Sequence, residues 1–365
     1  MSDRHAARRE RLLKSLKSTE AGAILVTSEV NVRYLTGFTG DSTFLLLGPK
    51  VTLLISDSRF ATQIEEECPG LEAHVRTQKT SLVAAVAGVL TNAKPGRVGF
   101  EADEVSFRFW EQLRDAAKTT ELTPLQGLVE QLRAVKDAGE IAEIREAVRL
   151  AERAFRVVTA GLTPDQTEIE ASHEIEATLR RFGAKGVSFE PIVAAGDRAA
   201  LPHYRPTRRR IGDDGLLLID WGACGPGGYV SDLTRTFATG KVPARMQKIH
   251  RVVDEARQAG IAAVRQGAKA ADVDAAPRNV IEAAGYGKNF GHGLGHGIGL
   301  QVHESVRLSA ISKDVLKAGM VMTIEPGIYL PGVGGVRIED DVLVTRDGCE
   351  VLSTLPREME QVALA

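Results

Sequence analysis

The stretch LLLIDWGACGPGGYVSDLTRT, residues 216–236, tells most about how this chain folds. An apolar run at 216–219 ends in Asp220, and Asp232 follows twelve positions later. Between the two aspartates, residues 225–228 are Gly-Pro-Gly-Gly, which is typical of the tip of a hairpin. We therefore expect a hairpin that turns both carboxylates toward one place.

Three more metal-ligating side chains follow in the C-terminal half: His296 in GHGLGHGIG, Glu325 in MTIEPG and Glu339 in GVRIED. Taken singly, each of the five residues could be an ordinary polar residue; Asp220 alone would be an acid at a strand end, and Glu325 a loop residue before proline. Together they offer four carboxylates, one imidazole and no thiolate, which favours a pair of Mn, Co, Fe or Zn ions over a structural zinc.

Charge supports two ions, because two divalent cations cancel four carboxylates. Without cations, so many crowded acids would repel one another and some would have to take up a proton. A pair of metal ions activates water and polarises a carbonyl group, so hydrolysis is the expected reaction class.

Histidines and glycines gather around His296. Only eight histidines occur in 365 residues, yet His292, His296 and His303 fall within twelve positions. The alternating glycines at 291–299 argue against a helix and indicate backbone packed closely against something. A metal centre fits that expectation.

Four motifs in this order resemble the pita-bread metallopeptidases, and most closely their Xaa-Pro branch of proline dipeptidase (prolidase) and aminopeptidase P. They are SFEPIVAAGDRAALPHY at 188–204, IDWGACGPGGYVSDLTRTFATG at 219–240, FGHGLGHGIGLQVHE at 290–304 and VMTIEPGIYLPGVGGVRIEDDVLVT at 321–345. NVRYLTGFTGDSTFLLL at 31–47 and LRAVKDAGEI at 132–141 also resemble that branch, so the resemblance covers nearly the whole chain.

The resemblance implies a role for each ligand. Asp220 would hold one metal ion, and His296 with Glu325 would hold the other. Asp232 and Glu339 would bridge the pair. Glu325 would also carry a proton from the attacking water to the leaving nitrogen. Manganese is the expected metal, with cobalt, zinc and iron as alternatives.

Further active-site residues follow from the same resemblance. His203 and His303 would orient the substrate and stabilise the tetrahedral intermediate. Arg337 would act beside the ligands, where it and Thr234 could fix the carboxylates by hydrogen bonds. His292 matches a further active-site histidine more loosely, and a structural role for it stays open.

The chain departs from the family at two points in the first motif. The two aspartates usually lie eleven positions apart in the family, whereas here the separation is twelve. Within a strand an extra residue would turn every later side chain to the other face, but in the turn at 225–228 it should leave both aspartates facing the metals. Trp221 is bulkier than the phenylalanine expected there.

The predicted fold is an α+β pita-bread catalytic domain at 134–365, preceded by a smaller α/β creatinase-like domain at 1–133. In the smaller domain, strand-like runs at 23–26, 43–47, 51–55, 73–76 and 97–101 alternate with helical patterns at 58–67, 80–91 and 105–117. In the larger one, apolar residues repeat along 141–158, and Thr163-Pro164-Asp165-Gln166 resembles the start of the next helix, which should end near Gly183. Further helices are expected at 244–266 and 271–284.

Composition places few limits on location and partners. A net charge of −2 favours neither nucleic acid nor an anionic membrane as a partner. Three scattered cysteines suit a reduced cytoplasm, and the basic start lacks the apolar core of a signal peptide. The resemblance adds a homodimer and small peptide substrates with proline at the second position.

The function that fits best is a metal-dependent Xaa-Pro peptidase, and first a proline dipeptidase. Arg307 lies where one prolidase subgroup places a basic residue for the substrate carboxylate, although it could equally be a surface arginine. Aminopeptidase P, another hydrolase of the fold such as methionine aminopeptidase or a creatine-cleaving relative, and a non-catalytic binding protein are the alternatives. The complete ligand set weighs against the last.

Overall fold

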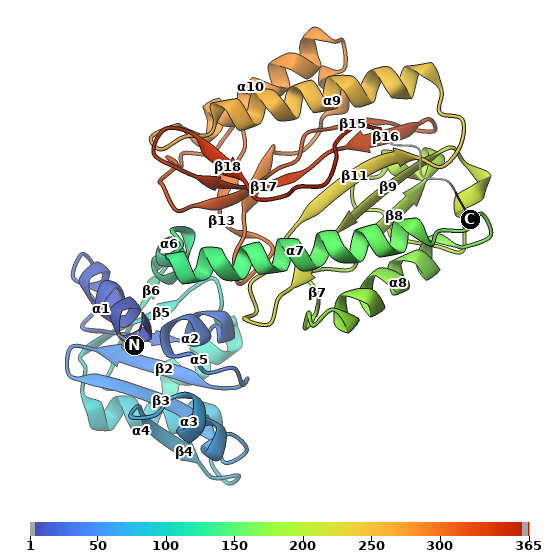
Figure 1. Ribbon diagram of the computed structural model, residues 1–365. Helices are drawn as coiled ribbons and strands as arrows, with labels where there is room; N and C mark the ends of the chain where they lie inside the picture. The colour runs from blue at the N-terminus through green and yellow to red at the C-terminus, as the bar shows by residue number, and fades with distance from the viewer. Residues whose placement is uncertain (1–3, 360–363, 365) are drawn as a thin grey trace. The chain divides into compact units, whose positions relative to one another are not determined.

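The computed structural model describes residues 4–359 and residue 364. The chain forms two compact units, Met1–Arg133 and Ala134–Ala365 (Figure 1). The ends of both predicted domains, 1–3, 360–363 and 365, lie outside the described residues. None of the described helices is long and apolar enough to cross a membrane.

The first unit is built on one mixed sheet with the strand order β4-β3-β2-β1-β5-β6. Its strands are β1 (Ala23–Val26), β2 (Phe44–Gly48), β3 (Val51–Asp57), β4 (Glu72–Arg76), β5 (Arg97–Glu101) and β6 (Glu121–Leu125). Because β1 pairs antiparallel with β2 and parallel with β5, the predicted α/β class with a mixed sheet is confirmed. Its helices are α1 (Arg4–Leu16), α2 (Glu29–Thr36), α3 (Ala61–Glu67), α4 (Leu82–Ala93), α5 (Phe107–Ala116) and α6 (Leu128–Ala134).

Three of these elements, α2, β6 and α6, were not expected from local patterns. Helix α2 has only eight residues and stops where Gly37 adopts φ +87°, a left-handed conformation that favours glycine. Strand β6 contains Pro124 at the edge of the sheet, where the missing N–H costs no ladder hydrogen bond. Short segments of this kind carry too few apolar repeats to be recognised by periodicity.

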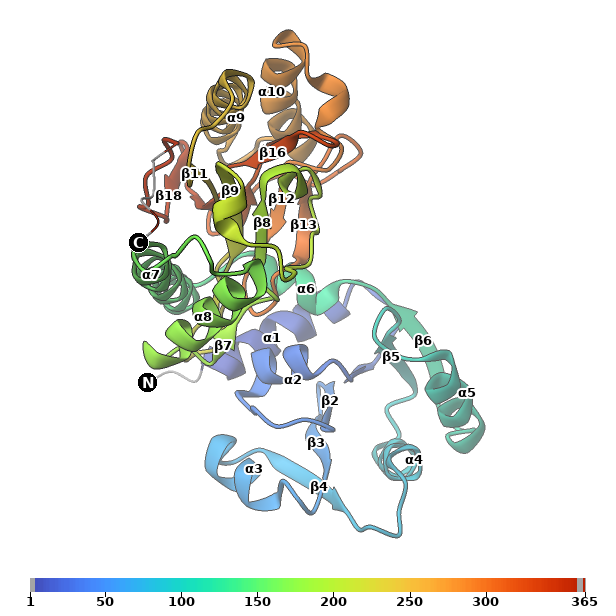
Figure 2. The same ribbon diagram turned by 90° about the vertical axis from the view of Figure 1, so that its right-hand side faces the viewer.

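The second unit consists of antiparallel sheets between pairs of helices. Its helices are α7 (Ala138–Ala160), α8 (Glu168–Arg181), α9 (Ala244–Ala263) and α10 (Ala270–Ala283). In Figure 1, α7 and α8 run below the strands and α9 and α10 above them, and the turned view of Figure 2 shows α9 beside α10. This is the expected α+β arrangement.

Two sheets of this unit carry the site. One has the order β11-β9-β8 and the other β13-β12-β14-β17-β18, while β15 and β16 form a separate hairpin. The bounds are β8 (Ile192–Ala195), β9 (Leu216–Trp221), β11 (Leu233–Ala238), β12 (Gly295–Gly297), β13 (Glu304–Leu308), β14 (Val321–Ile324), β15 (Gly327–Leu330), β16 (Gly334–Arg337), β17 (Asp340–Val344) and β18 (Cys349–Val351). The short strands β7 (Gly186–Val187) and β10 (Ala223–Cys224) pair with each other.

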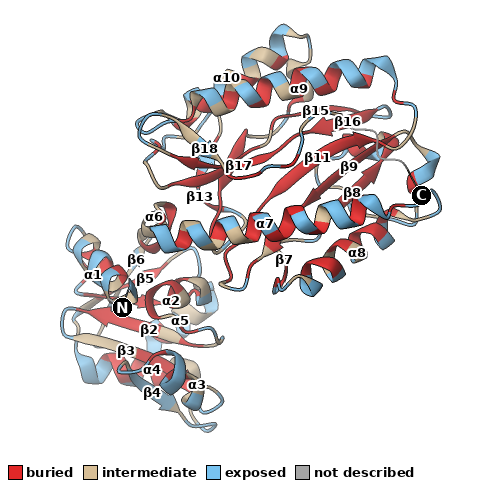
Figure 3. Ribbon diagram, in the orientation of Figure 1, coloured by how far each residue is buried: buried red, intermediate tan, exposed pale blue. Residues whose placement is uncertain are grey.

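Strand β9 is buried on both faces, as the red strands of Figure 3 show. Leu217, Ile219 and Trp221 belong to the apolar cluster under α7 and α8. Leu216 and Leu218 belong to a different cluster, which includes residues of α9. Since side chains alternate along a strand, Asp220 shares the face of Leu216 and Leu218, away from α7.

The side chain of Trp221 therefore points toward α7, on the opposite face of β9 from Asp220. Its ring stacks on Phe155 of α7 with centroids 4.2 Å apart, and its indole N–H donates a 3.0 Å hydrogen bond to the Ala151 carbonyl. The side chain is fully buried. The larger ring thus fills the interface with α7 and leaves the candidate site unchanged.

The predicted start of α8 at Thr163 is wrong. The helix begins at Glu168, with Thr167 as N-cap and Glu170 completing a reciprocal capping box. Thr163 to Gln166 instead form a turn. Both Thr-x-x-Gln and Thr-x-x-Glu fit the capping pattern, and the second of them caps the helix here.

Candidate metal centre and active site

The hairpin of β9 and β11 brings the two aspartates onto one face. Asp220 pairs with Thr234 in the register, and Asp232 lies two residues before Thr234, so these three side chains point the same way. The same register continues to a bridge between Cys224 and Val230. This leaves residues 225–229 as the tip, which includes the expected place of the extra residue at 225–228 and is closed by a 2.8 Å hydrogen bond from the Gly225 N–H to the Tyr229 carbonyl.

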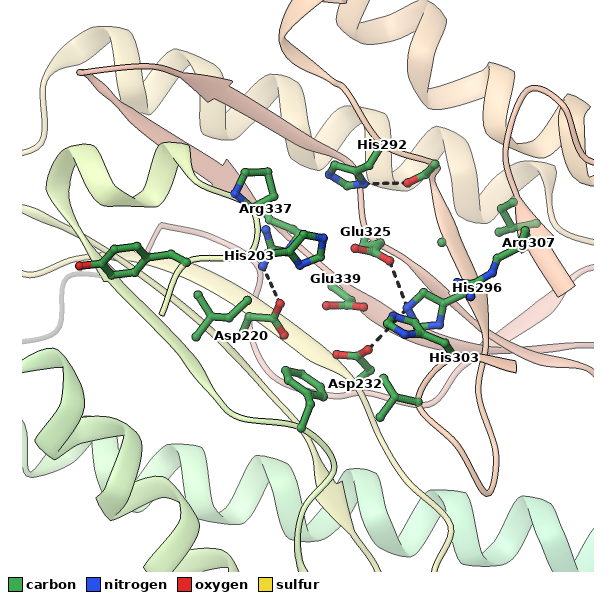
Figure 4. A pocket seen from close by; sticks show the side chains of 18 of the residues that line it. His203, Asp220, Asp232, His292, His296, His303, Arg307, Glu325, Arg337 and Glu339 are labelled. Carbon is green, nitrogen blue, oxygen red and sulfur yellow. Dashed lines mark hydrogen bonds and ion pairs between the residues drawn. The ribbon is translucent and has the colours of Figure 1, made fainter. Parts of the chain in front are cut away.

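The remaining three candidate ligands come from the other sheet. His296 lies in β12, Glu325 follows β14, and Glu339 lies between β16 and β17. Glu339 is tied to the hairpin because its N–H donates a 3.1 Å hydrogen bond to the Thr234 carbonyl. All five side chains meet in one cavity of about 560 Å³, shown in Figure 4.

The five groups lie within reach of common ions. Asp220, Asp232 and Glu339 each offer an oxygen within 4.8 Å of the others. The His296 Nε2 atom lies 3.4 Å from Glu325 Oε1 and 3.7 Å from Asp232 Oδ2. Asp232 is thus close both to the other two carboxylates of this group, Asp220 and Glu339, and to His296.

Burial and mutual repulsion make these carboxylates unstable as free anions. Burial raises the pKa of Asp232 and of Glu339 well above the ordinary range, and the neighbouring carboxylates raise it further. Burial also raises the pKa of Glu325 to about 8. Three arginines line the cavity, but among the described residues only Arg337 forms a hydrogen bond or ion pair with one of the four acids, so the cluster has too few protein cations to balance it.

Two oxygen atoms of the cluster also lack a protein partner. Asp220 Oδ1 and Glu339 Oε1 are buried and accept no hydrogen bond from the described residues. A buried unpaired carboxylate oxygen is costly unless a cation contacts it. The oxygen-rich donor set and these two free oxygens both fit divalent metal ions.

Arg337 organises the back of the cluster. It donates hydrogen bonds to Asp220 Oδ2 (2.5 Å), to Thr234 Oγ1 (3.0 Å) and to the Tyr329 hydroxyl (2.9 Å). The Thr234 hydroxyl in turn donates to Glu339 Oε2 at 2.7 Å. These bonds fix the orientation of two carboxylates, as the sequence suggested for Arg337 and Thr234.

Tyr329 was not identified from the sequence, because nothing in IEPGIYL distinguishes it from a core residue. Its hydroxyl lies 2.9 Å from His292 Nε2, and His292 Nδ1 lies 2.8 Å from the Gly293 carbonyl. Burial lowers the pKa of His292 to about 4, so the ring is neutral at neutral pH. His292 lines the cavity but both its nitrogens contact protein atoms, which supports a structural role.

His303 and His203 line the same cavity, and among the described residues neither imidazole forms a hydrogen bond with the carboxylates. The His303 ring meets the His296 ring edge-on, with centroids 4.3 Å apart. Burial lowers the pKa of His303, which is about half buried. His203 is exposed on the loop after the 3₁₀ turn Gly196–Ala200. Both imidazoles are therefore accessible to a bound ligand.

The glycines around His296 lie where the backbone packs closely against other parts of the chain. A Cβ atom on Gly295 would lie 2.1 Å from the Thr323 carbonyl, and one on Gly299 would lie 2.7 Å from Glu304 Oε1. The close approach is thus to strand β14 and to a glutamate. The expectation of closely packed backbone is confirmed at these two glycines.

Comparisons with known proteins agree with this geometry. The profile of metallopeptidase family M24 matches residues 142–346, and that of the creatinase/prolidase N-terminal domain matches residues 8–135. The chain is 37% identical to an uncharacterized peptidase, YqhT, of Bacillus subtilis over 92% of its own length and 94% of the relative's.

Solved structures with the same fold include peptidases of two kinds. The Xaa-Pro dipeptidase of Bacillus anthracis is 37% identical, with a TM-score of 0.93 over 99% of this chain and 100% of that one. The X-Pro aminopeptidase of Thermotoga maritima is 33% identical, with a TM-score of 0.86 over 94% of this chain and 98% of that one. The chain belongs to metallopeptidase family M24, and the resemblance seen in its motifs is confirmed. It is a metallopeptidase, and membership in this family implies divalent metal ions.

Proposed function

We propose that this protein hydrolyses the peptide bond between an N-terminal residue and proline, with two divalent metal ions, and that it is a proline dipeptidase. The observation that carries the proposal is the single cavity in which four carboxylates, His296 and two accessible imidazoles converge. The named activities of the Bacillus anthracis and Thermotoga maritima proteins support the Xaa-Pro class. We assign residues 134–365 as the catalytic domain.

The contacts support a division of the ligands. Asp220 would hold one ion, His296 and Glu325 the other, and Asp232 and Glu339 would bridge them. When bound, the ions polarise the substrate carbonyl and lower the pKa of a water molecule. Arg337 and Thr234 keep two of the carboxylates in place by the hydrogen bonds described above.

The chain's own residues would move and stabilise charge. Glu325 is buried and can hold a proton, so it can pass one to the proline nitrogen as the bond breaks. His303 and His203 can donate hydrogen bonds to the oxygen that gains negative charge and to the substrate. A bond to proline has no N–H of its own, so selectivity must come from the shape of the cavity around the ring.

Arg307 distinguishes the two candidate activities. It lines the cavity beside His303, and its guanidinium forms no ion pair with an acidic side chain of the described residues. A guanidinium at that place suits the free carboxylate of a dipeptide. Aminopeptidase P remains the second candidate, because a longer peptide would extend past Arg307. Manganese, a homodimer and a cytoplasmic location also remain proposals.

The test compares Ala-Pro, a longer Ala-Pro-Xaa peptide and Ala-Ala after addition of Mn²⁺ or Co²⁺. A dipeptidase cleaves Ala-Pro fastest, and Arg307→Met raises KM for Ala-Pro more than it lowers kcat. Faster cleavage of the longer peptide would favour aminopeptidase P. Equal cleavage of Ala-Ala would contradict the Xaa-Pro assignment and leave a broad aminopeptidase.

A further inference from the structure

A buried ion pair joins the first residues of the second unit to the loop that carries His303. Lys136 Nζ lies 3.1 Å from Glu304 Oε2, and the two side chains are 1% and 3% exposed. The Lys136 backbone is anchored by a 2.9 Å hydrogen bond from its N–H to the Gly319 carbonyl. Because removing two charges from water is costly, such a pair is weak evidence for stability and calls for another role.

The second oxygen of Glu304 closes the loop between β12 and β13. Glu304 Oε1 accepts a 2.9 Å hydrogen bond from the Leu300 N–H and a 3.4 Å one from the Gln301 N–H. The carboxylate lies so close to Gly299 that a Cβ atom there would be 2.7 Å from Oε1. Lys136 contacts one oxygen and the loop backbone donates to the other, so both oxygens of the carboxylate are held in place.

His303 is the residue directly before Glu304, at the end of this loop. Its ring reaches the cavity and meets His296, whereas neither Lys136 nor Glu304 is among the described residues that line the cavity. The pair can therefore affect a substrate only through the loop. A displacement of about 1 Å in an active-site group can cost ~10²-fold in rate.

We propose that Lys136 and Glu304 form a positioning pair, which holds the loop at 298–303 and so sets the His303 imidazole against the substrate. The consequence for catalysis rests on the proposed function, because that function gives His303 its role. The effect on the loop does not depend on it.

Three variants separate the parts of the pair. Glu304→Gln keeps an oxygen for the Leu300 N–H but turns an amide NH₂ toward the Lys136 ammonium, so donor faces donor. Lys136→Met keeps the length of the side chain and removes the ammonium group that lies beside Glu304 Oε2. The double variant Lys136→Met/Glu304→Gln removes both mismatches and keeps the hydrogen bonds to the loop.

The first measurement is hydrogen–deuterium exchange of peptides that cover 298–303, which needs no substrate. We expect faster exchange in this loop for Glu304→Gln and for Lys136→Met, and near-parental exchange for the double variant. Arg145→Met serves as the control, because Arg145 forms an exposed ion pair with Glu350 rather than a buried one. Unchanged exchange in both single variants would overturn the proposal.

The second measurement is a kinetic cycle with His303→Ala, using Ala-Pro. We expect Lys136→Met to lower kcat by ~10-fold or more with little change in KM, and to have no further effect in the His303→Ala background. Equal effects in both backgrounds would show that the pair affects turnover independently of His303 and would overturn the proposal. If the parent protein does not cleave Ala-Pro, the proposed function fails while the exchange result still decides the positioning role.

Discussion

Glu339 and Asp340 are neighbours in sequence and both are buried acids, yet their surroundings are opposite. Asp340 accepts hydrogen bonds from three arginines at 2.8–3.1 Å: Arg235, Arg257 and Arg357. Burial alone would raise the pKa of Asp340, but the arginines lower it below its ordinary value. Glu339 instead faces the carboxylates of Glu325 and Asp220, and its pKa is raised.

The difference shows that adjacent buried acids can belong to separate clusters. Glu339 lies between β16 and β17, and Asp340 is the first residue of β17. The Asp340 cluster brings its own cations and is complete. In the Glu339 cluster, only Arg337 among the described arginines forms an ion pair with one of the four carboxylates, so we expect cations from solution to complete the cluster. We take the first cluster as structural and the second as functional.

The largest effect is expected when a bridging carboxylate of the Glu339 cluster is removed. Asp232→Ala and Glu339→Ala should each lower the occupancy of both metal sites, because each of these carboxylates would bind two ions. Turnover should fall by on the order of 10³-fold or more, beyond the ~10–100-fold typical of residues that only orient ligands. Bound metal is measured by elemental analysis after dialysis. Retention of two ions per chain would contradict the bridging role.

The next effect concerns the stability of the Asp340 cluster. Asp340→Asn leaves the buried guanidinium of Arg235 without the anion of its ion pair, so the free energy of unfolding should fall by about 3–5 kcal/mol. Urea unfolding measures it, and Glu350→Gln, in the exposed pair with Arg145, should cost no more than about 1 kcal/mol. If both variants lose equally little unfolding free energy, burial of the arginines does not require the charge of Asp340.

A smaller effect on rate is expected for His303, which lies in the functional cavity but outside the ligand set. His303→Ala should lower kcat by ~10²-fold while the metal content stays near that of the parent, because only a hydrogen bond to the developing oxyanion is lost. Parallel metal analysis and kinetics test this. Loss of metal in this variant would make His303 a ligand and overturn its assignment.

The smallest effect is the pH dependence of the metal-free protein. Burial raises the pKa of Glu325 from 4.5 to about 8, so its stabilising contribution is present below pH 4.5 and is lost as pH rises through 8. His296 and His292, with pKa values lowered from 6.5 to about 3 and about 4, oppose this trend only below pH 6.5.

Between pH 6.5 and 8 the carboxylates therefore dominate. Metal-free protein should lose about 2 kcal/mol of unfolding free energy over this range through Glu325, and Asp232 and Glu339, whose pKa values are also raised, act in the same direction. Urea unfolding in the presence of chelator measures the loss. Addition of Mn²⁺ should abolish it, because bound cations favour the ionised form. A rise in stability with pH in chelator would contradict the electrostatic account.

Local patterns in the sequence were sufficient for part of the fold and the site. The apolar run before Asp220 and the glycine-rich tip predicted the hairpin, and the repeat along 141–158 predicted α7. The same pattern failed at the start of α8, where Thr163 and Thr167 both fit a cap. Only the three-dimensional structure distinguishes them, because Thr167 also lies beside Arg210 in a bridge.

Contacts between distant residues could not be predicted from spacing. Arg337 meets Asp220 across 117 positions, and Lys136 meets Glu304 across 168. For the adjacent acids Glu339 and Asp340, sequence does not show which cations fold around each. Tyr329 likewise gains its role only because β15 and β16 bring its hydroxyl to Arg337.

The most direct test of the account is a titration of metal-free protein with Mn²⁺, in which bound metal per chain and hydrolysis of Ala-Pro are measured in the same samples. We predict no hydrolysis in excess chelator, and activity that appears as about two ions bind per chain. Full turnover of Ala-Pro by protein verified to be free of metal would contradict the claim that external cations complete the Glu339 cluster.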